Sequence, residues 1–309
     1  MIEVQKLTKS FGDIHAVKGI SFQVQRGEIY GLLGPNGAGK TTTLSMLSGL
    51  LHPDAGRAVI DGVDLMEDPR AVKSRLGIVP QETALYKELS ARENLSFWGG
   101  MYGLSGRDLK DAIGRVLEQV SLSGRADEPV RRFSGGMTRR LNLALGLVHR
   151  PAVLLLDEPT VGIDPQARLN ILDVVRDVAA AGATVLYTTH YLEEAEKLCD
   201  RIGIMDHGEI LAEGSLTELK EMVGEEEVVT VQGRFELQEA RDRLGNLPGV
   251  RVLSGEDGRL VLGAAGSGRG AADLLAALFG GGLQVDGVSI QPPSLQSLFL
   301  KLTGRELRD

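Results

Sequence analysis

Short apolar runs alternate with helical patterns along the first two thirds of the chain. The runs are bounded by turn residues and read IYGLLG at 29–34, LGIVP at 76–80, VLLLD at 153–157 and TVLYTT at 184–189. Strands that are apolar at nearly every position are typical of a parallel sheet with helices on both faces. The pattern therefore predicts an α/β fold built on a mostly parallel sheet.

Between Leu89 and Leu122 the apolar residues have helical spacing, and no strand pattern interrupts them. We expect a helical insertion there, within a helical subdomain that covers about residues 89–150. Trp98 and Tyr102 lie one helical turn apart in this insertion. They could line a groove in which a partner docks, or they could pack in the core, and the sequence does not choose between the two.

A change of composition after the acidic run Glu225–Glu227 predicts a domain boundary, with one domain over residues 1–223 and another over 225–309. The second domain has a pattern of strands and helices in the order βαββαβ. We expect strands at 228–231, 250–253, 259–262 and 285–290, and helices at 237–244 and 271–279. A last helix behind a Ser294 cap is expected to pack against its own domain.

Composition indicates the partners and the cellular compartment to expect. The net charge of −8 opposes broad attraction to nucleic acid, so no nucleic-acid partner is expected. The single cysteine, Cys199, cannot form an intrachain disulfide, and the five histidines show no zinc-like pairing with it. No apolar run approaches the roughly 18–20 residues that span a bilayer. We therefore expect a cytoplasmic protein whose contact with a membrane, if any, is peripheral.

The stretch GPNGAGKT at Gly34–Thr41 follows an apolar strand and precedes a helix, as a phosphate-binding loop does. The backbone N–H groups of such a loop converge on phosphates, a lysine (here Lys40) meets the β and γ oxygens, and the Thr41 hydroxyl can bind Mg²⁺. A glycine-rich turn without a ligand is the other interpretation. The residues expected to contact a nucleoside triphosphate are Gly34, Pro35, Asn36, Gly37, Ala38, Gly39, Lys40, Thr41 and Thr42.

Two carboxylates, Asp157 and Glu158, end the strand at 153–157, at the edge where parallel sheets bind ligands. Asp157 is suited to hold Mg²⁺ through water, and Glu158 to polarise an attacking water. They could instead interact only with a helix dipole. His190 ends the strand at 184–189, which we expect to neighbour the Asp157 strand, so His190 could reach the γ-phosphate or could be structural.

A second glycine pair follows a serine in FSGGM at Phe133–Met137, where a helical pattern begins. The N–H groups of Ser134, Gly135 and Gly136 and the positive end of the helix could bind an anion. A helix cap without a ligand is the alternative.

The phosphate loop, this stretch and the Asp157 strand come in the order found in the ATP-binding cassette (ABC) superfamily, which residues 1 to about 223 resemble. The resemblance implies a cassette ATPase fold: a mostly parallel sheet, a β subdomain and a helical signature subdomain, here followed by a small α+β domain. It also implies that Ser134, Gly135, Gly136 and Met137 bind the γ-phosphate of ATP held by a second chain. A homodimer with two nucleotides at its interface is therefore expected.

Smaller motifs carry over from the same resemblance. Phe11 stands where the family stacks an aromatic ring on adenine, and Gln81 stands in the loop that senses Mg²⁺ and the membrane partner. The stretch VGID, which ends at Asp164, matches the loop that crosses the dimer. The chain departs from the family pattern at Met137, where glutamine is usual, at Phe133, where leucine is usual, and at Val161 and Ile163.

Two further stretches are THYLEEAEKLCDRIGIMDHGEI at 189–210 and PSLQSLFLKLTGRELRD at 293–309. They resemble the ATP-binding subunits of multidrug and antibiotic exporters of the daunorubicin-resistance type, and of related exporters whose membrane subunits are separate chains. The family usually has an acidic pair where this chain has Gln296 and Ser297. The resemblance implies an ATPase that uses ATP and Mg²⁺ and lies at the inner face of the cell membrane through a separate permease. Two alternatives stay open: a cassette ATPase that acts on ribosomes or DNA, and a module that senses ATP without hydrolysing it.

Overall fold

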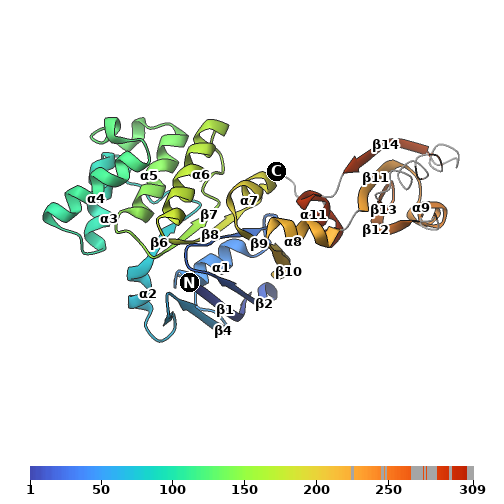
Figure 1. The fold of residues 1–309 in the computed structure, drawn as a ribbon, viewed down its shortest axis with the longest axis horizontal. Helices are drawn as coiled ribbons and strands as arrows, with labels where there is room; N and C mark the ends of the chain where they lie inside the picture. Colours follow the sequence, from blue (N-terminus) through green and yellow to red (C-terminus); the bar gives the residue numbers. More distant parts are fainter. Residues whose placement is uncertain are drawn as a thin grey trace. The chain divides into compact units, whose positions relative to one another are not determined.

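The computed structural model describes residues 1–223, 226–244, 247, 249–265, 274, 276, 284–291 and 294–304. Contacts group the chain into two compact units, residues 1–211 and residues 212–309 (Figure 1). Of the three sheets, two belong to the first unit and the third lies in the second unit.

A six-stranded sheet forms the centre of the first unit, with the strand order β10-β9-β3-β8-β7-β6. The strands are β3 (Ile29–Leu33), β6 (Leu76–Val79), β7 (Val153–Asp157), β8 (Thr184–Thr189), β9 (Arg201–Asp206) and β10 (Glu209–Gly214). Strand β3 pairs in parallel with β8 and β9, and β7 pairs in parallel with β6 and β8. The four apolar runs of the sequence thus form neighbouring parallel strands, as predicted.

Both faces of this sheet are covered, which explains why its strands are apolar throughout. Alternate residues of a strand point to opposite faces. On β7, Leu154 and Leu156 pack in one core with the helices formed by residues 91–147 and 165–180, whereas Val153 and Leu155 pack in a second core with the helix at 40–47 and the amino-terminal strands. A strand with a single buried face would have alternated polar and apolar residues.

The second core is closed by an antiparallel sheet with the order β2-β1-β4-β5. Its strands are β1 (Ile2–Phe11), β2 (Ile14–Val24), β4 (Ala55–Ile60) and β5 (Val63–Asp64), and the helices on this side are α1 (Lys40–Leu47) and α2 (Pro69–Arg75). The Phe22 ring stacks on Tyr30 of β3 with 5.2 Å between centroids. The two sheets therefore share one core.

The expected helical insertion contains α3 (Ala91–Met101), α4 (Gly106–Gln119), the short 3-10 turns η1 (Ser123–Arg125) and η2 (Val130–Arg132), and α5 (Gly135–Leu147). Helices α3, α4 and α5 contact one another and lie side by side in Figure 1. Trp98 and Tyr102 are both half-buried against the core, and Tyr102 stacks on His149 with 3.5 Å between ring centroids. Core packing is therefore the interpretation that the structure supports for these two residues.

Helix α5 lies directly against β6 because two glycines face each other there. A Cβ atom added to Gly77 would overlap the carbonyl oxygen of Gly146, and one added to Gly146 would come within 2.7 Å of Val79. Such distances leave no room for a side chain. Helices α6 (Pro165–Ala180) and α7 (Leu192–Leu198) complete this unit.

The second unit is a four-stranded antiparallel sheet with the order β12-β13-β11-β14 and with helices on it. Its elements are α8 (Leu216–Val223), β11 (Glu226–Arg234), α9 (Leu237–Leu244), β12 (Val250–Glu256), β13 (Arg259–Ala265), β14 (Gln284–Gln291) and α11 (Leu295–Thr303). These elements follow the predicted order. Of the helix expected at 271–279, Leu274 and Ala276 are helical and the rest lies outside the described residues.

Helix α8 belongs to the second unit because it packs against α11. The contacts therefore divide the chain after Leu211, whereas the change of composition placed the boundary after Val223. On one face of the sheet Val229, Leu260 and Leu262 pack with α9 residues, and on the other Val228 and Val261 pack with Leu300 of α11, as expected for a helix that packs against its own domain.

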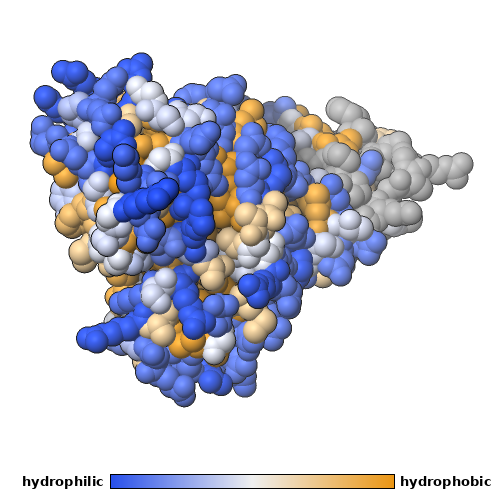
Figure 2. All heavy atoms as spheres, turned by 60° about the vertical axis from the view of Figure 1, so that its left-hand side comes forward, coloured by the Kyte–Doolittle hydropathy of each residue, from blue (hydrophilic) through white to orange (hydrophobic). Residues whose placement is uncertain are grey.

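The surface has both hydrophobic and hydrophilic residues. In the view of Figure 2, hydrophobic residues show as separate patches among hydrophilic ones. Among the described residues, no helix combines the length and the apolar character that crossing a membrane would require.

The close approach of α5 to β6 predicts a strong steric effect at Gly77. Gly77→Ala should lower the free energy of unfolding by about 1–3 kcal/mol, since a methyl group would overlap the backbone of Gly146. Gly114→Ala in α4 is the matched control, because open space surrounds that position and alanine favours a helix. Urea denaturation followed by circular dichroism measures both. A Gly77→Ala midpoint equal to that of the parent chain would contradict the packing described here.

Candidate functional site

The loop between β3 and α1 is shaped by its glycines. A Cβ atom on Gly34 would overlap the carbonyl oxygen of Met205, and Gly39 has a φ of 105°, which side chains rarely adopt. Asn36 and Gly37 are exposed, while Ala38 is buried and donates its N–H to Pro35. The exposed loop backbone is thus free to face a ligand, and α1 begins directly behind it.

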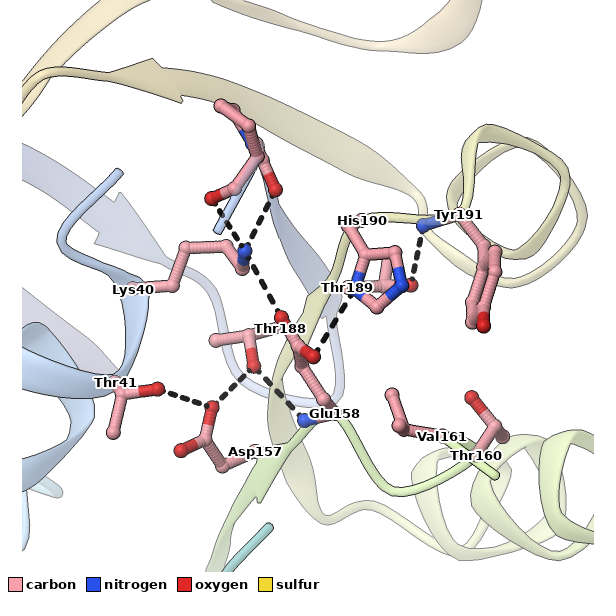
Figure 3. A network of polar contacts seen from close by, with 12 residues as sticks. Lys40, Thr41, Asp157, Glu158, Thr160, Val161, Thr188, Thr189, His190 and Tyr191 are labelled. Atoms are coloured by element: carbon pink, nitrogen blue, oxygen red, sulfur yellow. Dashed lines mark hydrogen bonds and ion pairs between the residues drawn. The ribbon is translucent and has the colours of Figure 1, made fainter. Parts of the chain in front are cut away.

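Lys40 begins α1 and is only 4% exposed. Its Nζ atom donates to the carbonyl oxygens of Gly34 (2.6 Å) and Pro35 (3.0 Å) and lies 3.0 Å from Oε1 of Glu158 (Figure 3). The next residue, Thr41, is exposed, and Thr42 is half-buried. The ammonium group therefore lies between the phosphate loop and the carboxylate at the end of β7.

Asp157, the last residue of β7, is buried and faces two hydroxyl groups. Its Oδ1 atom accepts hydrogen bonds from Thr188 Oγ1 (2.7 Å) and from Thr41 Oγ1 (3.2 Å). Burial raises the pKa of Asp157, and the two hydroxyl donors oppose that rise in part. The carboxylate and the Thr41 hydroxyl, both oxygen groups of the kind that Mg²⁺ prefers, are thus adjacent.

Glu158 lies between two cationic or potentially cationic groups. One carboxylate oxygen contacts Lys40, and the other lies 3.0 Å from Nδ1 of His190. Burial raises the pKa of Glu158, but the Lys40 ammonium and His190 outweigh it, so the pKa lies below its usual value. Glu158 is therefore ionised at neutral pH.

His190 follows β8 directly, and β8 pairs with β7, as the sequence predicted. This pairing brings His190 to Glu158 although 32 residues separate them. Its ring also contacts Tyr191, with 4.2 Å between centroids. Lys40, Asp157, Glu158 and His190 therefore form one connected polar group at the carboxyl ends of the parallel strands (Figure 3).

The stretch FSGGM forms the beginning of α5, away from that group. Ser134 is exposed, and its Oγ accepts from the backbone N–H of Met137 at 3.2 Å, as a helix cap does. A Cβ atom on Gly136 would lie 2.7 Å from Ala167 of α6, whereas one on Gly135 would meet no atom closer than 3.9 Å. Packing alone thus requires the second glycine but not the first.

The remaining predicted residues lie at the end of a strand or in the connections between elements. Phe11 is half exposed at the end of β1, with Lys9 Nζ 5.8 Å from its ring centroid. Gln81 is exposed just after β6. Asp164 caps α6 by accepting from Ala167 N at 2.9 Å. In the part of the chain that is described, no hydrogen bond or ion pair joins these three side chains to Lys40 or Glu158.

Several residues of the site are not apparent from the motifs. Thr188 orders Asp157, and it also accepts from the backbone N–H of Glu158 at 3.0 Å. The guanidinium of Arg139 on α5 donates to the carbonyl oxygens of Gln81 and Val161, and so links two loops. The only sequence signal for Thr188 is a hydroxyl residue within an apolar strand, and Arg139 is one of two adjacent arginines with nothing to mark it.

Comparison with known proteins identifies the fold and family. A profile of the ABC transporter family matches residues 17–161, and one of the DrrA1-3-like ATP-binding protein C-terminal domain matches residues 214–303. The chain is 45% identical over its whole length to the whole linearmycin resistance ATP-binding protein LnrL of Bacillus subtilis (strain 168). This chain belongs to the ABC transporter family. It is an ABC ATPase, and the predicted family and fold are confirmed.

Other relatives of this ABC ATPase cover nearly the same length. The daunorubicin resistance ATP-binding protein DrrA3 of Streptomyces coeruleorubidus is 40% identical over 99% of this chain and 97% of its own. The Nod factor export ATP-binding protein I of Cupriavidus metallidurans (strain ATCC 43123 / DSM 2839 / NBRC 102507 / CH34) is 41% identical over 100% of this chain and 99% of its own.

Solved structures cover the cassette part. An ATP-binding subunit of an ABC transporter is 31% identical, with a TM-score of 0.67 over 72% of this chain and 93% of that one. A dimeric ATP-binding cassette in a post-hydrolysis state, bound to ADP and Pi, is 26% identical, with a TM-score of 0.64 over 70% of this chain and 99% of that one. ABC cassettes of this kind bind ATP and ADP.

The raised pKa of Asp157 yields a prediction about stability in the ABC ATPase. Because the folded pKa lies above the unfolded one, the ionised carboxylate costs stability at neutral pH, and this cost disappears as the pH falls below the unfolded value of about 3.9. Asp157→Asn should therefore unfold at an equal or higher urea concentration at pH 7, and its advantage should shrink toward pH 4.

The control for loss of one charge is Asp177→Asn, since Asp177 is exposed on α6. A marked fall in the Asp157→Asn midpoint at pH 7, without one in the control, would contradict the assigned cost of burial.

Proposed function

We propose that this ABC ATPase hydrolyses ATP to power the export of a drug-like or antibiotic-like compound through a separate membrane subunit. The support comes from the relatives, which are named for linearmycin resistance, daunorubicin resistance and Nod factor export and which match this chain from end to end. The membrane subunit would hold the ATPase at the inner face of the cell membrane.

The site fits a nucleoside triphosphate and Mg²⁺. The exposed backbone at Asn36 and Gly37 would face the phosphates, and Lys40 would exchange part of its contact with Glu158 for the β and γ oxygens. Thr41 and Asp157 would hold Mg²⁺, with Gln81 near it through its loop. Mg²⁺ supplies positive charge that neutralises the phosphates during transfer. Phe11, half exposed, suits stacking on the adenine.

The observation that carries the hydrolytic role is the position of Glu158. Its carboxylate lies between Lys40 and His190, each at 3.0 Å, and is ionised. An ionised, buried carboxylate at the strand end can accept a proton from water, while His190 orients it and can donate toward the γ-phosphate. A module that only senses ATP would not require this arrangement, and so we favour turnover over that alternative.

A homodimer would give the second glycine-rich stretch a ligand. Ser134–Met137 form the cap and first turn of α5, and within the described chain no hydrogen bond or ion pair joins them to Lys40 or Glu158. In a homodimer they would face the γ-phosphate bound to the partner subunit, with Asp164 in the loop that crosses between the chains. A dimeric relative with a known structure supports this arrangement.

An exposed aromatic cluster is suited to dock the membrane subunit. Tyr86, Phe97 and Met101 are 50%, 44% and 70% exposed, and the Tyr86 and Phe97 rings meet edge to face at 5.2 Å. The cluster lies on α3 and on the segment that follows Gln81. An apolar cytoplasmic segment of the permease would cover it. A ribosome- or DNA-directed ATPase is less well supported, since the chain is acidic and its relatives are export and resistance proteins.

Replacement of Glu158 tests the hydrolytic role. Glu158→Gln should keep ATP affinity but lower the rate of phosphate release by about 10²- to 10⁴-fold, the loss expected when a general base is removed. Phosphate release and nucleotide titration measure the two effects. Glu193→Gln, an exposed residue of α7, is the control and should behave as the parent chain. Parental turnover in Glu158→Gln would remove Glu158 from the mechanism.

The role of FSGGM across two chains is tested in the Glu158→Gln background, which should accumulate as an ATP-dependent dimer. Adding Ser134→Arg should abolish dimerisation but not ATP binding, because the arginine would occupy the place of the partner's γ-phosphate while the phosphate loop is unchanged. Sedimentation with and without Mg-ATP distinguishes monomer from dimer.

The control for the dimerisation test is Ser123→Arg, an exposed serine in the same helical part. If the Ser134→Arg double variant still dimerises with ATP, FSGGM is only a helix cap.

A further inference from the structure

A second buried carboxylate lies beside the site without being part of any motif. Glu194 on α7 is 1% exposed. Its oxygens accept hydrogen bonds from three hydroxyl groups: Thr160 Oγ1 at 2.7 Å, Tyr187 OH at 2.8 Å and Thr189 Oγ1 at 2.9 Å. Arg168 Nε lies 3.4 Å away. A buried carboxylate is costly unless it is paired and hydrogen-bonded, and this one satisfies both conditions.

Two of the hydroxyl groups belong to residues that are close in sequence to Glu158 and His190. Thr160 lies two residues after Glu158, in the loop that leaves β7 (Figure 3). Thr189 ends β8 and directly precedes His190. The Glu194 carboxylate therefore ties the Glu158 loop to the His190 strand through one buried group.

The backbone conformation of Glu158 is one that must be held in place by its neighbours. Glu158 has a φ of 43°, in the left-handed region that residues other than glycine adopt at a cost. Such a conformation persists only where the surroundings impose it. On one side, Thr188 accepts the Glu158 N–H at 3.0 Å. On the other side, Thr160, two residues further along the chain, donates its hydroxyl to Glu194.

We propose that Glu194 is a positioning residue for hydrolysis, which acts through Thr160 to hold the Glu158 carboxylate at His190. The proposal rests on the proposed function. Without the Thr160 contact, the loop can relax from its left-handed conformation, and the Glu158 carboxylate moves away from the position at which it accepts a proton. The Thr160 hydroxyl itself contacts Glu194 and not Lys40 or the phosphate loop, so we expect ATP binding to be retained.

Glu194 could instead serve stability alone, and the network offers a matched pair of variants that separates the two roles. Thr160→Val and Tyr187→Phe each remove one hydroxyl donor from the same carboxylate with little change of shape. Tyr187 lies within β8 and not in a loop. Burial and the negative charge of Glu194 raise the pKa of Tyr187 well above its usual value, so its hydroxyl stays protonated and remains a donor. Thr160 lies in the Glu158 loop itself, whereas Tyr187 reaches that loop only through a longer contact of 3.4 Å between its OH and Thr160 Oγ1.

The experiment compares the purified full-length variants in steady-state ATP hydrolysis and in thermal unfolding. We expect Thr160→Val to lower kcat by about tenfold to a hundredfold, the loss that a small misplacement causes, with KM for ATP changed less than about twofold. Tyr187→Phe should lower kcat much less at a comparable loss of stability. Thr160→Ser, which restores the hydroxyl, should recover most of kcat.

Equal losses of kcat in Thr160→Val and Tyr187→Phe, in proportion to their loss of stability, would overturn the positioning role. A parental kcat in Thr160→Val would do the same. Glu158→Gln is measured alongside: if it is slow while Thr160→Val is not, only this inference fails. If Glu158→Gln itself turns over normally, the hydrolytic role proposed for Glu158 fails, and with it the basis of this inference.

Discussion

The arrangement of the first unit depends on the buried contact between Lys40 and Glu158. Both side chains are 4% exposed, and a buried ion pair is tolerated only where further hydrogen bonds satisfy it. The carbonyl oxygens of Gly34 and Pro35 do so for Lys40, and His190 does so for Glu158. These partners come from the phosphate loop and from two adjacent parallel strands, so the strand order of the sheet is a requirement of this one pair.

Local patterns determined much of what could be predicted. The apolar runs identified all four neighbouring strands of the central sheet, because a strand buried on both faces has a composition of its own. Lys40, Asp157, Glu158 and His190 were identified from their positions after strands, and the sheet brings them together. The order of elements in the second unit also followed from the pattern within the described residues.

Features that depend on distant residues could not be predicted. Nothing in the sequence around Glu194 shows that its carboxylate meets Thr160, which lies 34 residues earlier. The boundary after Leu211 depends on the packing of α8 against α11, which no change of composition marks. Trp98 and Tyr102 have the same spacing whether they face a partner or the core, and only the position of His149 and its neighbours decides between the two.

The facing glycines of β6 and α5 limit which sequences this architecture accepts. A side chain at Gly77 would overlap the backbone of α5, and a side chain at Gly146 would overlap Val79 of β6. Neither glycine can therefore be replaced while the helix keeps its place. Larger residues at both glycines would move α5 away from the sheet. Ser134, which caps α5, would move with the helix. Substitution at this buried contact between strand and helix is thus limited by the position that the exposed Ser134 must keep.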